Sequence, residues 1–223
     1  MRDVFHSELD SIADQLVEMT GLAGSAIASS TTALLTADLA LAESVIAGDV
    51  QIDRLQRDLD DRAIELLARQ QPVATDLRVV VSSLRMSATL ERMGDLARHV
   101  SQIARLRFPE RAIPEELVPT FADMGELGEG IALKAGRVIS TRDLEVAAEV
   151  EVDDDEVDRL HKHVFATLMS GAWEHSVEQT VDVTLASRYY ERFSDHAVSL
   201  ARRVEFLVTG RWSQPTPTPT PTA

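Results

Sequence analysis

Two pairs of acidic residues in this sequence have a spacing that suggests cation binding. Glu91 is followed by Asp95, and 100 residues later Glu191 is followed by Asp195 in the same Glu-Arg-x-x-Asp pattern. Positions i and i+4 lie on one face of an α-helix, so each pair directs two carboxylates toward a common point. Like charges at that distance repel, and a sequence that contains the arrangement twice suggests that a cation lies between them.

A second acid pair with the same spacing precedes each of these. Asp49 and Asp53 precede the first, and Asp154 and Asp158 precede the second. Consecutive helices joined by a short turn are antiparallel neighbours, and each pair lies about 20 residues from the turn, so four carboxylates converge at one height. Hard carboxylate oxygens suit Mg²⁺, Ca²⁺, Mn²⁺ or iron ions. The spacing therefore predicts these metal ligands: Asp49, Asp53, Glu91, Asp95, Asp154, Asp158, Glu191 and Asp195.

The simpler interpretation is that these carboxylates are solvated and paired with nearby arginines. Arg54, Arg92, Arg159 and Arg192 could neutralise them. The recurrence of both pairs at aligned positions favours metal binding over this interpretation. On a helical wheel the acids lie opposite the apolar side chains of their helices, so they should face outward or into a groove.

Other motifs give little support for catalysis. Asp158 and His161 resemble the Glu-x-x-His of di-iron bundles, but Glu-x-x-His itself is absent, so a di-iron oxidase is not expected. His99 and His196 flank the acid pairs and could join a site, although neither is duplicated in register. No phosphate-binding glycine loop or nucleophile elbow is present. We expect neither an enzyme nor an organic cofactor.

Composition excludes several functional classes. The chain has 223 residues, a net charge of −15 and no cysteine, and only 4% of its residues are aromatic. The negative charge argues against nucleic acid as a partner, and the lack of cysteine excludes disulfides and zinc fingers. No apolar run approaches 20 residues and no signal peptide is evident, so we expect a cytoplasmic protein without membrane insertion.

The apolar residues recur in steps of three and four, which predicts an all-α protein. Met86, Leu90, Met93 and Ala97 form one such stripe. Prolines, which are disfavoured inside helices, divide the chain. We expect helices over 3–29, 33–70 with a break near Gly48, 73–107, 120–138, 141–173 and 176–210.

The chain also contains an internal repeat. Asp38-Leu39 matches Asp143-Leu144 at an offset of 105, and the Glu-Arg-x-x-Asp segments match at an offset of 100. Two tandem three-helix bundles, forming an elongated six-helix protein, explain this pattern best. The expected divisions are a first repeat over 1–108, a proline-containing linker over 109–119, a second repeat over 120–212 and a disordered Pro-Thr tail over 213–223.

With these motifs in view, the chain resembles the PhoU family over nearly all of residues 1–212. The resemblance rests on these segments: Asp49-x-x-Ile52-Asp53-x-Leu55, Gln70-Gln71-Pro72-Val73-Ala74-x-Asp76-Leu77-Arg78, Leu90-Glu91-Arg92-Met93-Gly94-Asp95, Asp154-x-x-Val157-Asp158-x-Leu160 and Tyr190-Glu191-Arg192-Phe193-Ser194-Asp195-His196-Ala197. The resemblance implies tandem three-helix bundles that are not enzymes and that bind metal clusters through the eight acids named above. The expected ions are divalent or ferric: iron, zinc, manganese or magnesium.

The resemblance also implies a regulatory function. Such a protein would repress phosphate uptake and the phosphate-starvation response when phosphate is ample. It would act as an adaptor between the ATPase subunit of the phosphate ABC transporter and the phosphate-sensing histidine kinase, as a homodimer. The alternatives are a carboxylate-bridged metalloenzyme or ion store, and a purely structural bundle whose acids only solvate it.

The second repeat departs from the family pattern in two places. Ser194 stands where the first repeat has Gly94, which implies a more crowded or weaker site. The turn Gln70-Gln71-Pro72 has no counterpart in the second repeat, where Glu174-His175-Ser176 stands. The two halves are therefore not expected to be functionally equal.

Overall fold

The computed structural model describes residues 2–212, with side chains from residue 5 onward, so the predicted tail over 213–223 lies outside the described residues. The described chain is almost entirely helical, which confirms the all-α prediction. Its elements in order are α1 (Arg2–Thr36), α2 (Leu39–Gln70), α3 (Ala74–Arg107), the 3₁₀ helix η1 (Glu115–Leu117), α4 (Val118–Thr141), α5 (Leu144–Leu168) and α6 (Val177–Thr209).

The repeated residues explain why helices α2 and α5 begin where they do. The Asp38 carboxylate accepts a hydrogen bond from the backbone N–H of Leu41, and the Asp143 carboxylate accepts bonds from the N–H groups of Glu145 and Val146. A side-chain oxygen at this position satisfies backbone donors that have no partner within the helix. The two repeats therefore start their second helices with the same cap.

Two of the expected helix limits were wrong in the first repeat. Helix α1 extends to Thr36 rather than ending near residue 29, and α2 passes Gly48 without a break. Ser30 and Thr31 lie beyond the expected end of this helix, but both are buried inside α1. Ser30 Oγ lies 2.7 Å from the Ala97 carbonyl oxygen on α3, so packing against that helix favours continued helix over the local turn preference of these residues.

The limits in the second repeat differ less. Helix α4 begins at Val118, so Pro119 lies in its first turn instead of in the linker. Proline is tolerated there because its missing N–H would have no intrahelical partner. Helix α5 ends at Leu168, a few residues before the expected limit.

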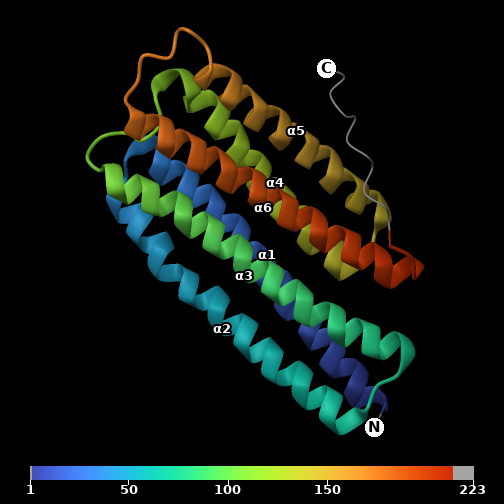
Figure 1. Ribbon diagram of the computed structural model, residues 1–223. Coiled ribbons are helices and arrows are strands. Elements are labelled where there is room, and N and C mark those ends of the chain that lie inside the picture. The colour runs from blue at the N-terminus through green and yellow to red at the C-terminus, as the bar shows by residue number, and fades with distance from the viewer. Residues whose placement is uncertain (1, 213–223) are drawn as a thin grey trace.

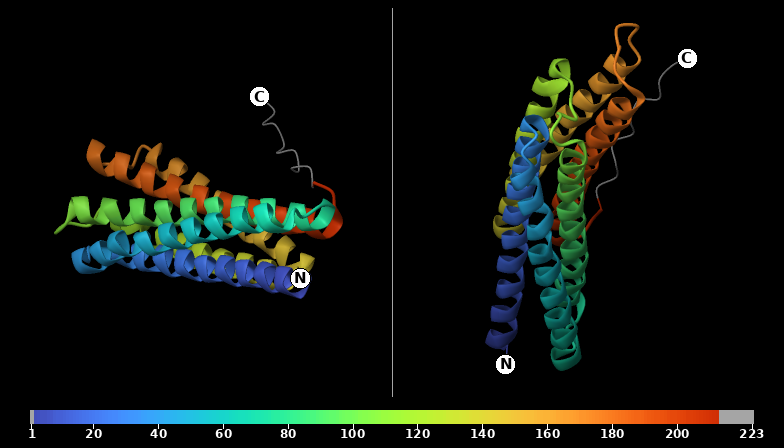
Figure 2. Two further views of the ribbon diagram at one scale, coloured as in Figure 1. Left: turned by 90° about the horizontal axis from the view of Figure 1, so that it is seen from below. Right: turned by 90° about the vertical axis from the view of Figure 1, so that its left-hand side faces the viewer.

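The six helices form one elongated bundle in which the repeats lie side by side (Figures 1 and 2). Within each repeat the three helices pack against one another, while α1 contacts α4 and α3 contacts α6 across the junction. The division into domains at the boundaries given above stays a prediction, since the repeats share one contiguous set of buried apolar side chains. None of the described helices combines the length and the apolar character needed to span a membrane.

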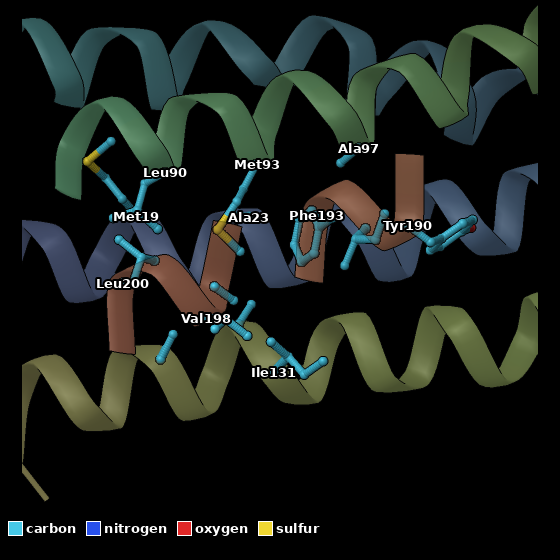
Figure 3. Close-up of a cluster of buried hydrophobic side chains, with 14 of the residues drawn as sticks. Met19, Ala23, Leu90, Met93, Ala97, Ile131, Tyr190, Phe193, Val198 and Leu200 are labelled. Atoms are coloured by element: carbon cyan, nitrogen blue, oxygen red, sulfur yellow. The ribbon is translucent and has the colours of Figure 1, made fainter. Parts of the chain in front are cut away.

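The apolar stripes that the sequence predicted meet at this junction. Leu90 and Met93 on α3 and their repeat counterparts Tyr190 and Phe193 on α6 are buried in one cluster (Figure 3). The Tyr190 hydroxyl, which is also buried, lies 2.7 Å from Thr31 Oγ1 on α1, so its polar atom is satisfied. The junction between the repeats is therefore the core of the protein.

Helices α1 and α4 approach closely at a glycine. A Cβ atom added at Gly125 would lie 2.8 Å from Thr31 Cβ, which is closer than two such atoms can come without movement. Because Cβ is fixed by the backbone, relief would require α1 and α4 to separate. Gly125 therefore sets the distance between the two repeats at this point.

Candidate functional site

The first set of acids consists of Asp49 and Asp53 on α2 and Glu91 and Asp95 on α3, and the fold brings them together. The negative charges of Asp95 and Asp53 raise the pKa of Asp49, and the charges of all three aspartates raise the pKa of Glu91. Helices α2 and α3 are neighbours joined by a short turn, so acids at similar distances from that turn reach the same level.

These side chains lie in the groove between α2 and α3 and not on an open face. The Asp49 side chain is only 9% exposed, and those of Asp95 and Glu91 are 18% and 23% exposed. Burial is the largest cause that raises the pKa values of Asp49 and Glu91 above their usual range, and the neighbouring carboxylates raise them further. The groove thus concentrates negative charge in a poorly hydrated place.

Arg98 already supplies a cation to this first set. Its guanidinium forms an ion pair with Asp49 on α2, with Nε 2.9 Å from Oδ2, and another with Asp95 on α3. It therefore bridges the two helices and lowers the pKa of Asp49. Arg98 was not predicted from the sequence, although Arg98 follows Asp95 by three residues and Glu91 by seven and so lies on the same helix face.

Arg92 behaves as the salt-bridge interpretation predicted. It lies 3.6 Å from a Glu91 oxygen and 3.4 Å from an Asp95 oxygen. Its side chain is 65% exposed, so these pairs contribute little to stability. Arg92 and Arg98 together neutralise part of the first set.

Gly94 allows α2 and α3 to approach each other at this level. A Cβ atom added there would lie 3.0 Å from Asp49 Oδ1 and 2.8 Å from Ile52 Cδ1. The absence of a side chain leaves room for the Asp49 carboxylate to enter the groove. The repeat counterpart of Gly94 is Ser194, and the second set differs accordingly.

The second set, Asp154 and Asp158 on α5 with Glu191 and Asp195 on α6, is also brought together. Asp195 and Asp158 both raise the pKa of Asp154, and both raise that of Glu191. Burial is again the largest cause, and the pKa of Asp154 rises from 3.8 to about 6. Ser194 Oγ donates a hydrogen bond to Asp154 Oδ1 and so offsets a part of this effect.

The second set has no counterpart of Arg98. The aligned position holds Val198, which is buried. Within residues 5–212, no cationic side chain forms ion pairs with acids of this set on both α5 and α6. Asp158 pairs with Lys162 one turn away, at 3.4 Å, and Glu191 pairs with Arg188 on its own helix. Glu191 Oε2 is buried without a hydrogen-bond partner. This set therefore retains more uncompensated negative charge than the first.

Three histidines lie near the acid sets. His161 Nδ1 lies 2.6 Å from Ser187 Oγ on α6, and the ring of His99 packs against Tyr189 with centroids 5.2 Å apart. Burial lowers the pKa of His161, His99 and His196, so the neutral imidazole is favoured at each. The hydrogen bond to Ser187 accounts for His161, whereas Nδ1 of His99 is buried without a hydrogen-bond partner.

The donor types of both sets fit a hard metal ion, but the two sets differ in availability. Within the described part of the chain, no three acidic or histidine side chains already have the arrangement of a metal shell. In the first set Arg98 holds the position between the helices. In the second set Val198 supplies no cation between the helices, and Glu191 Oε2 has no hydrogen-bond partner.

The chain is similar to known proteins along most of its length. The PhoU domain model matches residues 16–104 and again 121–204. The chain belongs to the PhoU family. The phosphate-specific transport system accessory protein PhoU homolog 2 of Mycobacterium tuberculosis is 48% identical over 210 residues, which is 94% of this chain and 99% of the relative. PhoU homolog 1 of Mycobacterium leprae is 45% identical over 96% of both chains.

Solved structures agree on the fold. The crystal structure of PhoU from Pseudomonas aeruginosa aligns with a TM-score of 0.84 and 29% identity over 93% of this chain and 100% of that chain. PhoU from Streptococcus pneumoniae aligns with a TM-score of 0.82 and 23% identity over 94% of this chain and 99% of that chain, and shows the same fold. The predicted family and the predicted fold of two tandem three-helix bundles are therefore both confirmed.

Each of the two PhoU domain copies contains one complete acid set. Two of the matched positions at which the copies differ adjoin the acid sets: Gly94 against Ser194 and Arg98 against Val198. The first difference was noted from the sequence, and the structure adds the second.

Proposed function

We propose that this chain is an accessory regulator of phosphate transport that keeps uptake and the phosphate-starvation response repressed when phosphate is ample. The observation that carries the proposal is the match to proteins named as accessory proteins of the phosphate-specific transport system, at 41–48% identity over 94–96% of this chain. These relatives are also covered over 95–99% of their own length, which supports a shared function of the whole chain.

The proposed mechanism is adaptor binding without catalysis, in the cytoplasm. The homodimeric protein binds the ATPase subunit of the phosphate ABC transporter and the phosphate-sensing histidine kinase. The six long helices support this role because an elongated bundle offers faces distant enough for two partners (Figure 1). Exposed apolar side chains such as Val73, Val177 and Met169 supply contact area on these faces.

The proposed regulation can be tested in cells that lack every PhoU-family gene, because a second relative could mask a single deletion. A reporter driven by a phosphate-starvation promoter should be active at high phosphate in the deletion strain. Reintroducing this chain should restore repression. Continued reporter activity at high phosphate, with the protein present at its normal level, would remove the regulatory proposal.

We further propose that the protein binds a divalent or ferric ion, with the second set as the stronger site. Asp154, Asp158, Glu191 and Asp195 would hold the ion, which would supply positive charge between α5 and α6 where Val198 supplies none. The carboxylate chemistry and the unpartnered Glu191 oxygen support this site. At the first set Arg98 competes with an ion for Asp49 and Asp95.

The metal content of two double variants tests which set of acids binds the ion. Purified protein is stripped with a chelator, loaded with Mn²⁺ and measured by elemental analysis after gel filtration. Glu191→Ala with Asp195→Ala should remove most of the bound ion, and the matched pair Glu91→Ala with Asp95→Ala should remove less. Unchanged content in both variants would show that these residues are not the ligands. Turnover of a substrate by the loaded protein would instead favour the metalloenzyme alternative.

A further inference from the structure

One end of the bundle has exposed apolar side chains on two adjacent helices. Leu77 and Val81 near the start of α3 are 40% and 37% exposed, and Val208 and Trp212 near the end of α6 are 46% and 53% exposed. Leu77 and Val81 are four residues apart and form a ridge along α3. Trp212 lies beyond the end of α6 at Thr209, and its ring stacks on Phe206 of that helix. We call these four residues, with the arginines described next, the α3–α6 end surface.

The exposed apolar side chains of α3 and α6 belong to one surface because the two helix ends are in contact. The guanidinium of Arg78 on α3 lies 6.0 Å from the ring centre of Phe206 on α6, and a Cβ atom at Gly210 would lie 3.6 Å from Arg78 Nη1. Figure 2 shows the start of α3 and the end of α6 together at the same end of the molecule. The exposed apolar side chains of α3 and of the C-terminal end of α6 therefore lie at one end of the bundle, where the apolar face of a partner helix could contact both.

Four arginines belong to the same helix ends. Arg78 and Arg85 are on α3, Arg203 is on α6, and Arg211 follows α6. The acids on the same two helix ends are Asp76 and Glu205, so arginines outnumber acids there. Burial and the positive charge of Arg85 both lower the pKa of Arg203. In a chain of net charge −15, this end therefore carries a local excess of positive charge.

Two of these arginines, Arg78 and Arg203, lie against aromatic rings. Phe206 and Trp212 stack with centroids 4.4 Å apart, and Arg203 lies 5.4 Å from the Trp212 ring centre. Cation–π contacts orient a guanidinium while its N–H donors stay available to an anion. The surface is therefore already arranged to bind carboxylates beside an apolar stripe.

We propose that the α3–α6 end surface binds an acidic amphipathic helix of a partner protein. Apolar side chains of that helix, spaced at i, i+4 and i+7, would contact Leu77, Val81, Val208 and Trp212, and its flanking glutamates or aspartates would bind the arginines. A helix confined to this end meets the four arginines, which outnumber the acids there. An anionic membrane would extend beyond it and meet the acidic remainder of the protein, which would repel it.

The other end of the bundle lacks this combination. Val177 and Val181 on α6 are exposed at the positions that correspond to Leu77 and Val81. There, however, Arg107 of α3 is neutralised by Glu178 and Asp182. The repeat thus duplicates the apolar ridge but not the available cations, and the proposed binding is specific to one end.

Peptide binding to the purified protein tests this proposal. The probe is a labelled synthetic helix with leucine along one face and glutamate on both flanks, measured by fluorescence anisotropy. Arg78→Glu with Arg85→Glu should weaken binding about tenfold or more, because attraction at the rim becomes repulsion. Arg54→Glu with Arg105→Glu changes the net charge equally on exposed helix positions elsewhere and should change affinity less than about twofold. A peptide with lysine in place of glutamate should not bind.

Several results would overturn the proposal. Equal weakening by both arginine pairs would mean that the probe senses only the overall charge. Full binding after Leu77→Ser with Val81→Ser would mean that the apolar ridge is not used; circular dichroism verifies that these exposed changes leave the fold intact. Binding to phosphatidylglycerol vesicles through Arg78 and Arg85, without peptide binding, would assign the surface to a membrane. Peptide binding requires no phosphate regulation, so its failure and that of the proposed function are distinguishable.

Discussion

Neutralising Asp154 should stabilise the protein at pH 8. The Asp154 carboxyl is half-buried between α5 and α6, near Asp158 and Asp195, and its pKa rises from 3.8 to about 6. Between these two values the native state binds more protons than the unfolded state, so stability falls as pH rises through that window. Asp154→Asn removes the buried charge and keeps an oxygen that accepts the hydrogen bond from Ser194.

The magnitude follows from the pKa values. A difference of about two pKa units corresponds to about 3 kcal/mol at pH 8, where the carboxyl is ionised in both states. Because the group is only half-buried, water and salt screen part of this energy, and we expect a gain of about 1–2 kcal/mol. At pH 5 the native carboxyl is largely protonated, so the gain should fall by about half.

Urea unfolding at pH 8 and pH 5, in the presence of a metal chelator, measures both values. The matched control is Asp49→Asn in the first repeat. Burial raises the pKa of Asp49 too, but Arg98 lowers it, and the substitution removes that ion pair. The control should therefore gain less at pH 8 than Asp154→Asn does.

The dependence on pH is the decisive part of this experiment. A gain that is the same at both pH values would show that asparagine acts through packing and not through charge. Destabilisation at pH 8 would refute the conclusion that the second set holds uncompensated negative charge.

Three further predictions concern other contacts. Tyr190→Phe removes the buried hydroxyl that bonds Thr31 and should cost about 1 kcal/mol in urea unfolding; no loss would mean that this bond contributes nothing net. Gly125→Ala forces α1 and α4 apart and should cost about 1–3 kcal/mol by the same measurement, whereas Gly130→Ala, where nothing lies nearby, should cost nothing; equal effects would contradict the close approach. Arg98→Met leaves Asp49 and Asp95 without their bridge, so it should lower stability by about 1–3 kcal/mol without metal and increase Mn²⁺ uptake in elemental analysis; unchanged uptake would exclude competition between Arg98 and an ion.

Much of the fold was predictable because it depends on local patterns. The spacing of Leu90, Met93 and Ala97 gave the helix and its buried face, and all three are buried. The Asp38 and Asp143 caps could be aligned because capping uses only neighbouring residues. The extension of α1 through Ser30 was not predictable, since the groups that satisfy its hydroxyl include the Ala97 carbonyl, 67 residues away in the sequence.

The candidate site was likewise predictable only in its local features. The types and spacing of the acids identified both sets, because i and i+4 spacing is a property of one helix. The sequence also showed that Gly94 is replaced by Ser194, although the consequence, a hydroxyl bonded to Asp154, required the packing of α5 on α6. The role of Arg98 was missed because an ion pair to Asp49 depends on how closely α2 approaches α3.

The sequence by itself thus determined the helices, the duplication and the eight carboxylates, all of which follow from short-range periodicity and composition. Only the tertiary structure decided how charged each set remains, because that depends on burial and on cations supplied across a helix pair. Arg98 spans α2 and α3, whereas Val198 leaves α5 and α6 without such a bridge. The same reason makes the two ends of the bundle unequal. The apolar ridge of α3 recurs on α6 with the sequence, but Arg107 at one end pairs with Glu178 and Asp182, whereas Arg78 and Arg203 at the other end lie against aromatic rings.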